Sequence, residues 1–195
     1  MGLWIFIGVL VAIALFVIGV YNRLIALRNR FKNGFAQIDV QLQRRHDLIP
    51  NLVEAAKGYM AHEAQTLTAV TEARSAAMGA RKAASEHPEN GSAMNALGRA
   101  ESMLSGALAN FMALAENYPE LRANESISQL MEELSSTENR IGFARQAFND
   151  AVMSYNTYRE QFPNNFVAGL FGRFDEAQLL KIETEQARIA PKVSF

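Results

Sequence analysis

The first 22 residues of the chain contain no charged side chain, and residues 3–21 form an almost unbroken apolar run. Nineteen helical residues at about 1.5 Å each reach roughly 28 Å, which is close to the hydrocarbon thickness of a bilayer. Trp4 and Tyr21 stand near the two ends of this run, where aromatic rings favour the headgroup layer. We therefore predict a transmembrane helix over residues 1–22.

A cleaved signal peptide is the main alternative to a membrane anchor. Such a peptide normally has a basic n-region, a shorter apolar core and a cleavage site of small residues. Here nothing basic precedes the run, and bulky basic residues follow it. Met1-Gly2 begins a myristoylation motif, but Phe6 occupies the position that needs Ser or Thr. We therefore expect the apolar helix to be retained as the anchor.

Basic residues gather directly after the apolar run. Residues 23–45 contain six basic residues and one acidic residue, whereas the whole chain has 19 and 20. We expect the first four basic residues to form a collar for anionic lipid headgroups, namely Arg23, Arg28, Arg30 and Lys32. The positive-inside rule predicts a single-pass protein of the bacterial inner membrane with its N-terminus outside and its body cytoplasmic. The acidic remainder argues against nucleic acid as a partner.

Small residues lie along one face of the predicted transmembrane helix. Gly8, Ala12 and Gly19 follow a spacing of four and then seven residues. Such a stripe lets two membrane helices approach closely, so these residues are candidates for an oligomerisation face of a homo-oligomer. Gly and Ala are also common in membrane helices without any partner, which leaves a purely compositional explanation open.

Beyond the membrane segment, apolar residues recur at helical spacing. Leu24, Phe31 and Ile38 repeat every seven residues, and similar stripes run from Leu52 to about Lys82, from Met94 to Met112 and from Ile127 to Tyr155. No window shows strand-like alternation bounded by hairpin turns. The pattern predicts an all-α protein in which the transmembrane helix leads into an antiparallel bundle of about four long helices with one shared core. We assign residues 23–162 to this bundle.

Pro50 interrupts the first soluble stretch. Proline removes a backbone donor and disfavours helix at the preceding residue, so Pro50 marks either a kink or the first turn of a new helix. In the second case Asp47 would be placed to cap the freed amides.

Residues 163–195 differ in character from the bundle. Aromatic residues gather here in a stretch with Gly, Asn and little charge, and we consider Phe162, Phe166, Phe171 and Phe174 an aromatic contact surface. These rings either pack across the end or side of the bundle or contact lipid or a neighbouring subunit. Residues 175–190 are compatible with a short charged helix ahead of Pro191.

Three stretches of the chain resemble a known family. The stretches are RLIALRNRFKNGFAQIDVQLQRRHDLIPNLVEAAKGYMAHE at residues 23–63, STENRIGFARQAFNDAVMSYNTYREQFP at residues 136–163, and the terminus APKVSF. They resemble the signature blocks of LemA family proteins, with Phe148 where the family usually has Tyr. The resemblance covers nearly the whole chain and implies an N-terminal membrane anchor and a bundle of long helices. It does not imply a biochemical mechanism.

Polar residues are dense in the first two of these blocks. If the two helices pack together, opposite charges would form a buried or half-buried inter-helix network that sets their register. The alternative is an ordinary solvated face, on which each exposed pair contributes under about 1 kcal/mol. The candidate residues are Asp39, Arg44, Arg45, Asp47, Asn51, Glu54, Glu138, Arg140, Arg145 and Asn149, with Asn139 and Asp150 beside them.

No enzyme motif stands out in the sequence. His62-Glu63-Ala64-Gln65-Thr66 approaches the zinc-protease pattern H-E-x-x-H, but Thr66 replaces the second histidine. The chain has no cysteine, and its three histidines are too scattered to suggest a metal cluster. Phosphate-binding and nucleophile-elbow motifs are absent from the sequence as well. We therefore expect no enzyme and no cofactor.

Two functions fit these observations. The first is a membrane-anchored, self-associating helical scaffold that organises or remodels the membrane, or presents a surface to another envelope protein. The second is a monomeric regulatory adaptor of a membrane protease or receptor. A transport role is weaker, because the single span has no polar residue to line a conduit.

Overall fold

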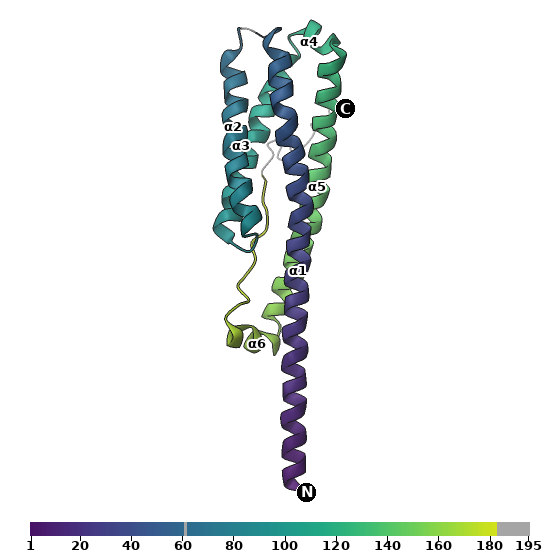
Figure 1. The fold of residues 1–195 in the computed structure, drawn as a ribbon, viewed down its shortest axis with the longest axis vertical. Coiled ribbons are helices and arrows are strands. Elements are labelled where there is room, and N and C mark those ends of the chain that lie inside the picture. Colours follow the sequence, from purple (N-terminus) through teal and green to yellow (C-terminus); the bar gives the residue numbers. More distant parts are fainter. Residues whose placement is uncertain (61, 183–195) are drawn as a thin grey trace, which may run out of the picture.

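The computed structural model describes residues 1–60 and 62–182, and their helices are antiparallel neighbours in an elongated bundle (Figure 1). The helices are α1 (Gly2–Lys57), α2 (Ala64–Glu86), α3 (Gly91–Ala115), α4 (Pro119–Ala123), α5 (Glu125–Glu160) and α6 (Asn164–Phe171). No strand occurs among the described residues. The prediction of an all-α chain with an apolar N-terminal helix and a helical bundle is confirmed.

α1 carries both the apolar run and the first helix of the bundle. Its 56 residues would span about 84 Å at 1.5 Å per residue. The N-terminal third projects freely from the bundle, and Val20 is the first of its buried residues (Figure 1). α1 is long and apolar enough in this part to cross a membrane.

Pro50 lies inside α1 and does not end it. The interpretation of Pro50 as the start of a new helix, with Asp47 as its cap, is therefore wrong. The helix ends at Lys57, and the predicted stripe from Leu52 to Lys82 belongs to two helices, α1 and α2. Since proline has no N–H, the carbonyl of His46 four residues earlier loses its helical donor. Arg74 of α2 replaces it, because its Nε donates to the His46 oxygen at 2.6 Å.

Asparagine side chains cap two of the later helices. Oδ1 of Asn90 accepts from the amides of Ser92 and Ala93 at 2.9 and 3.1 Å at the start of α3. Oδ1 of Asn124 accepts from the amide of Ile127 at 3.2 Å at the start of α5. These bonds satisfy amides that have no partner within the helix.

The core consists of two apolar clusters rather than the single shared core that we predicted. The membrane-distal cluster joins the end of α1 to α2, α3, α4 and the first part of α5. The membrane-proximal cluster joins residues 20–42 of α1 to the second half of α5, α6, the segment that follows α6, the end of α2 and the start of α3. α2 and α3 are shorter than α5 and do not reach the membrane-facing end (Figure 1).

The segment Arg173–Ile182, which we name the strap, is extended and runs back along the bundle (Figure 1). Phe174, Ala177 and Leu180 are its buried residues, one in every three. The predicted charged helix over residues 175–190 is not present in residues 175–182, and its remainder lies outside the described residues. The strap begins at α6, beyond the ends of α2 and α3, and its later residues lie between α3 and α5.

Candidate functional site

The membrane-facing end of the bundle holds most of the residues that the sequence singled out. Gly8, Ala12 and Gly19 are exposed on the free part of α1. A Cβ atom built at Gly8 or Gly19 would meet nothing within 4 Å. Within residues 1–60 and 62–182 of a single chain, this face of the apolar helix therefore has no protein neighbour.

The predicted collar divides into two pairs of residues. Arg28 and Lys32 face the turn between α2 and α3, where their nitrogens lie 3.8 and 3.0 Å from the Glu89 carboxylate. Partial burial acts to raise the pKa of Glu89, but the hydrogen bond from Lys32, a backbone amide and the charges of Lys32 and Arg28 lower it below its ordinary value. This half of the collar is used in holding the bundle together.

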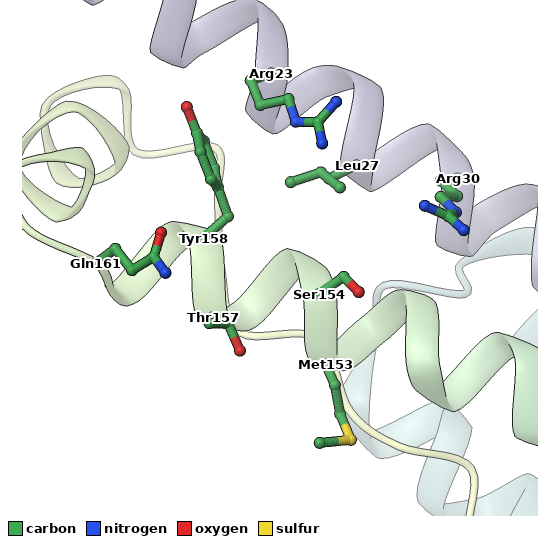
Figure 2. A pocket seen from close by; sticks show the side chains of 8 residues that line it. All are labelled: Arg23, Leu27, Arg30, Met153, Ser154, Thr157, Tyr158 and Gln161. Carbon is green, nitrogen blue, oxygen red and sulfur yellow. The ribbon is translucent and has the colours of Figure 1, made fainter.

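Arg23 and Arg30 belong to the other half of the collar and remain exposed. They line an open cleft of about 390 Å³ between α1 and the end of α5. Figure 2 shows Arg23, Leu27 and Arg30 on α1 opposite the end of α5, where Tyr158 lies. The cleft is completed by Met153, Ser154, Thr157 and Gln161. The guanidinium groups of its arginines and the hydroxyl groups of its lining are of the kind that binds an anionic lipid headgroup.

The predicted aromatic surface is split between interior and exterior. Phe174 is buried in the membrane-proximal cluster, whereas Phe162 and Phe166 are exposed and Phe171 is partly exposed. The ring of Tyr21 lies 4.9 Å from that of Phe171 and 5.5 Å from that of Phe174, both edge to face. Packing against the bundle therefore holds for Phe174, whereas contact of Phe162 and Phe166 with lipid or a neighbouring subunit stays a prediction.

Hydrogen bonds from α5 fix the strap by its main chain. Asn149 Nδ2 donates to the Leu180 carbonyl at 3.3 Å, and its Oδ1 accepts from the Leu180 amide at 2.9 Å. Asn156 pairs in the same way with Ala177, at 2.8 and 3.0 Å. Asn149 and Asn156 are seven helical residues apart, and Ala177 and Leu180 are three extended residues apart. Both separations are about 10 Å, so the two asparagines match the strap in register.

Glycines of α3 form the opposite wall of the strap. A Cβ atom at Gly98 would lie 2.4 Å from the carbonyl oxygen of Lys181, and one at Gly91 would lie 2.6 Å from Cγ of Gln178. Nη1 of Arg145 also donates to the Ile182 carbonyl at 2.8 Å. The predicted network residues Arg145 and Asn149 thus bind the strap rather than the first signature block.

A buried polar layer separates the two apolar clusters. Arg45, His46 and Glu101 are all fully buried, on α1 and α3. The Arg45 guanidinium pairs with the carboxylates of Glu101 and Glu138, and it lies 3.3 Å from Ser105 Oγ. Nε2 of His46 lies 3.0 Å from the second Glu101 oxygen. The layer therefore joins α1, α3 and α5 through ionic hydrogen bonds.

His46 is neutral within this layer. Burial, followed by the charges of Arg45, Arg81 and Arg74, lowers its pKa to about 3, against a smaller opposite effect of Asp47. The Glu101 carboxylate would favour a charged imidazole, but it is already neutralised by Arg45. With the proton on Nε2, His46 donates to Glu101, and its buried Nδ1 is an acceptor without a donor among the described residues.

The other predicted network residues do not join this layer, and each has separate surroundings. Asp39 accepts from Arg81 of α2 at 2.8 Å, and Arg44 pairs with Glu133 of α5. Within α1, Asp47 accepts from Gln43, and Glu54 pairs with Lys57 at 2.6 Å. Asn51, Asn139, Arg140 and Asp150 are exposed. Arg45 with Glu138 is the pair that links the two signature blocks directly.

The sequence interpretation missed His46, Glu101 and Arg74. Glu101 falls on the α3 stripe of Leu97, Leu104 and Leu108, and His46 falls on the α1 stripe between Leu42 and Ile49. A charged residue on an apolar stripe was the available signal. Residues of metal-ligating type form no cluster of three or more in the described part of the chain.

Comparisons with known proteins identify relatives of the whole helical body. Residues 34–195 match the model of the LemA family. The chain is 24% identical over 167 residues to the magnetosome protein MamQ of Magnetospirillum gryphiswaldense, and 25% identical to magnetosome protein MamQ 2 of Paramagnetospirillum magneticum. Each alignment covers 78% of this chain and 61% of the relative, so the chain spans about three fifths of the length of these proteins.

Proposed function

Because the chain belongs to the LemA family, and because its N-terminal helix is long and apolar enough to cross a membrane, we propose that it is a membrane-anchored, self-associating helical scaffold. The scaffold would organise or remodel the membrane, or present a surface to another envelope protein. The observation that carries this proposal is the continuity of α1, which contributes residues to both apolar clusters. Because the helical body and the membrane segment share this one helix, a change in the orientation of the body changes the orientation of the membrane segment.

Self-association is supported by the surface of the free helix. Its 18-residue apolar window is only 6% buried within a single chain, and the small-residue face is open at Gly8 and Gly19. Close packing of such faces stabilises membrane helix pairs through van der Waals contacts. Membrane lipid and further copies of the chain are therefore the partners that we propose, with no catalytic step and no cofactor.

The test is the mass and shape of the full-length protein in native-lipid particles, measured by mass photometry and electron microscopy. We expect particles of several copies with a regular shape. Gly8→Leu with Gly19→Leu should shift the particles toward single-chain mass, whereas Ile13→Leu, on another face of the helix, should leave the mass distribution unchanged. Monomeric particles of the unsubstituted protein would overturn the scaffold.

The alternative is a monomeric adaptor of a membrane protease or receptor. The exposed cleft between α1 and α5 favours it to a lesser degree, since it offers a polar surface close to the membrane. Crosslinking followed by affinity purification should then give one stoichiometric partner and no contacts between copies.

A further inference from the structure

α6 presents an apolar face away from the bundle. Phe166 and Leu170 of α6 are 69% and 76% exposed, and Phe162, in the turn before the helix, is 80% exposed with its ring 5.9 Å from that of Phe166. The opposite face of the helix, with Asn164, Val167 and Ala168, is buried against the bundle. Residues 161–172 contain no charged side chain, so water solvates this face poorly.

The exposure of this face does not result from a loosely attached helix. The carbonyl of Tyr158 accepts a 3.1 Å hydrogen bond from Asn164 Nδ2 at the start of α6. Phe171 contacts the ring of Tyr21 at the other end, and the strap that follows is held by Asn149 and Asn156. α6 is therefore fixed on both sides, with its apolar face held outward.

The position of α6 along the molecule identifies what covers that face. Tyr21 ends the apolar run of α1, and it touches the end of α6 and the start of the strap. Figure 1 shows α6 at the end of the bundle from which the apolar part of α1 projects. If residues 3–21 span the hydrocarbon layer, α6 lies at the height of the headgroups. Arg23 and Arg30 of the adjacent cleft lie just above it.

We propose that α6 is an interfacial helix that lies on the membrane next to the anchor. Phe162, Phe166 and Leu170 enter the boundary between headgroups and acyl chains, as the apolar face of an amphipathic surface helix does. This inference rests on the proposed membrane anchoring and is independent of self-association. A second copy of the chain is the competing occupant, but the height of α6 beside Tyr21 favours lipid.

The absence of cysteine from the chain permits a direct test. Phe166→Cys in the full-length protein is labelled with the fluorophore NBD and placed in nanodiscs of phosphatidylcholine and phosphatidylglycerol. Phe143→Cys is the matched control, since Phe143 is 76% exposed on α5, away from the membrane-facing end. We expect the probe at position 166 to emit at shorter wavelength and to lose at least half of its fluorescence to spin-labelled acyl chains, with little change at position 143.

Equal quenching at both positions, or none at position 166, would overturn the proposal. A blue shift without lipid quenching that vanishes in single-copy nanodiscs would also overturn it and assign the face to a second copy. If position 166 is quenched and the unsubstituted protein is monomeric in native-lipid particles, the interfacial helix stands and the scaffold fails.

A second set of variants tests the face itself. A probe at Gly169→Cys, where an added Cβ meets nothing within 4 Å, reports the depth of α6 without altering the apolar face. Phe162→Ser with Phe166→Ser should reduce its lipid quenching at least threefold, whereas Phe143→Ser should not. Circular dichroism verifies that the helical content is unchanged. Unaltered quenching in the double variant would contradict the inference.

Discussion

At the scale of single residues, the polar layer is the feature with the largest energetic consequence. Arg45, His46 and Glu101 are fully buried between two apolar clusters, and each has a partner of opposite charge or a hydrogen-bond partner. Removing one member of a buried ion pair leaves an uncompensated charge, which costs about 3–5 kcal/mol. The layer therefore specifies which helix faces meet, whether or not it adds net stability.

We expect the effect of Glu101→Gln to change sign with the residue at position 45. In the unsubstituted protein, Glu101→Gln removes the partner of Arg45 and destabilises the fold. Arg45→Met should cost about 3–5 kcal/mol, because the Glu101 carboxylate is then buried without a cation. Adding Glu101→Gln to Arg45→Met should recover part of that loss.

Urea unfolding in mild detergent, followed by circular dichroism, measures these free energies. Arg44→Met is the control, because the exposed Arg44–Glu133 pair contributes under about 1 kcal/mol. A Glu101→Gln effect of the same sign and size in both backgrounds would show that the two groups are not coupled.

His46 makes the stability of the fold dependent on pH. Its pKa is about 3 in the folded chain and 6.5 in the unfolded chain, so between these values only the unfolded chain binds the proton. Stability from this group is complete above pH 6.5 and falls by about 1.4 kcal/mol per pH unit as the pH decreases toward 3. His46→Gln keeps a donor for Glu101 but cannot be protonated, and it should lose about 2 kcal/mol less than the parent between pH 7.5 and pH 5. Urea unfolding at both pH values would reject this role of His46 if the two proteins lose equal stability.

At the scale of single elements, α1 and the strap both depend on donors supplied by another helix. α1 passes through Pro50 because Arg74 of α2 donates to the unpaired His46 carbonyl. The strap lacks regular secondary structure, yet the backbone groups of Ala177 and Leu180 are paired with asparagine side chains of α5. In each case a long-range contact satisfies backbone groups that local structure leaves free.

Arg74→Met should destabilise the protein by about 1–3 kcal/mol, because a carbonyl in the helix loses its donor. Pro50→Ala provides an amide at the proper position for the same carbonyl. The cost of Arg74→Met should therefore be much smaller in the Pro50→Ala background. Thermal unfolding of the four proteins completes this double-mutant cycle, and equal costs in both backgrounds would contradict the explanation.

Gly98→Ala should displace the strap, since the added Cβ would meet the Lys181 carbonyl at 2.4 Å. We expect faster hydrogen exchange at the amides of Ala177 and Leu180 and a lower Tm. Gly106→Ala on the same helix is the matched control, because its Cβ meets nothing within 4 Å. That substitution should raise stability by up to about 1 kcal/mol through helix propensity. Unchanged exchange in Gly98→Ala would mean that the wall of α3 does not confine the strap.

At the scale of the whole molecule, one helix of 56 residues links the membrane segment to both apolar clusters. The proposed interfacial helix and the open half of the collar lie at the same end of the bundle as the anchor (Figure 1). The membrane-facing end is thus aromatic and basic, whereas the distal end is closed by α4. This difference between the two ends predicts that the aromatic and basic end lies against the membrane and that the distal end points away from it.

The basic residues that follow the apolar run predict a cytoplasmic body. Single cysteines at two exposed positions test this in the cysteine-free chain: Gly2→Cys before the span and Ser126→Cys at the distal end. In intact spheroplasts, a membrane-impermeant maleimide should label position 2 at once and position 126 only after detergent is added. The opposite labelling would place the body on the outer side of the membrane.

The sequence by itself determined the fold class and the long apolar N-terminal helix. An uncharged run of this length is long enough to span a bilayer as a helix, and a stripe such as Leu24, Phe31 and Ile38 is apolar on one face of any helix. Asn90 and Asn124 likewise act through amides two or three residues away. These properties depend on neighbours in the chain, so they can be recognised without knowledge of the tertiary structure.

The tertiary structure alone decided which polar and aromatic residues pair. Pro50 looked like a break because its replacement donor, Arg74, is 28 positions from His46. Arg145 and Asn149 looked like network residues, but their partners are main-chain atoms of the strap. Phe174 is buried because its ring packs against Tyr21 and the membrane-proximal cluster, whereas Phe166 stays exposed. Local periodicity contains no information about such contacts, because they depend on how distant segments meet in space.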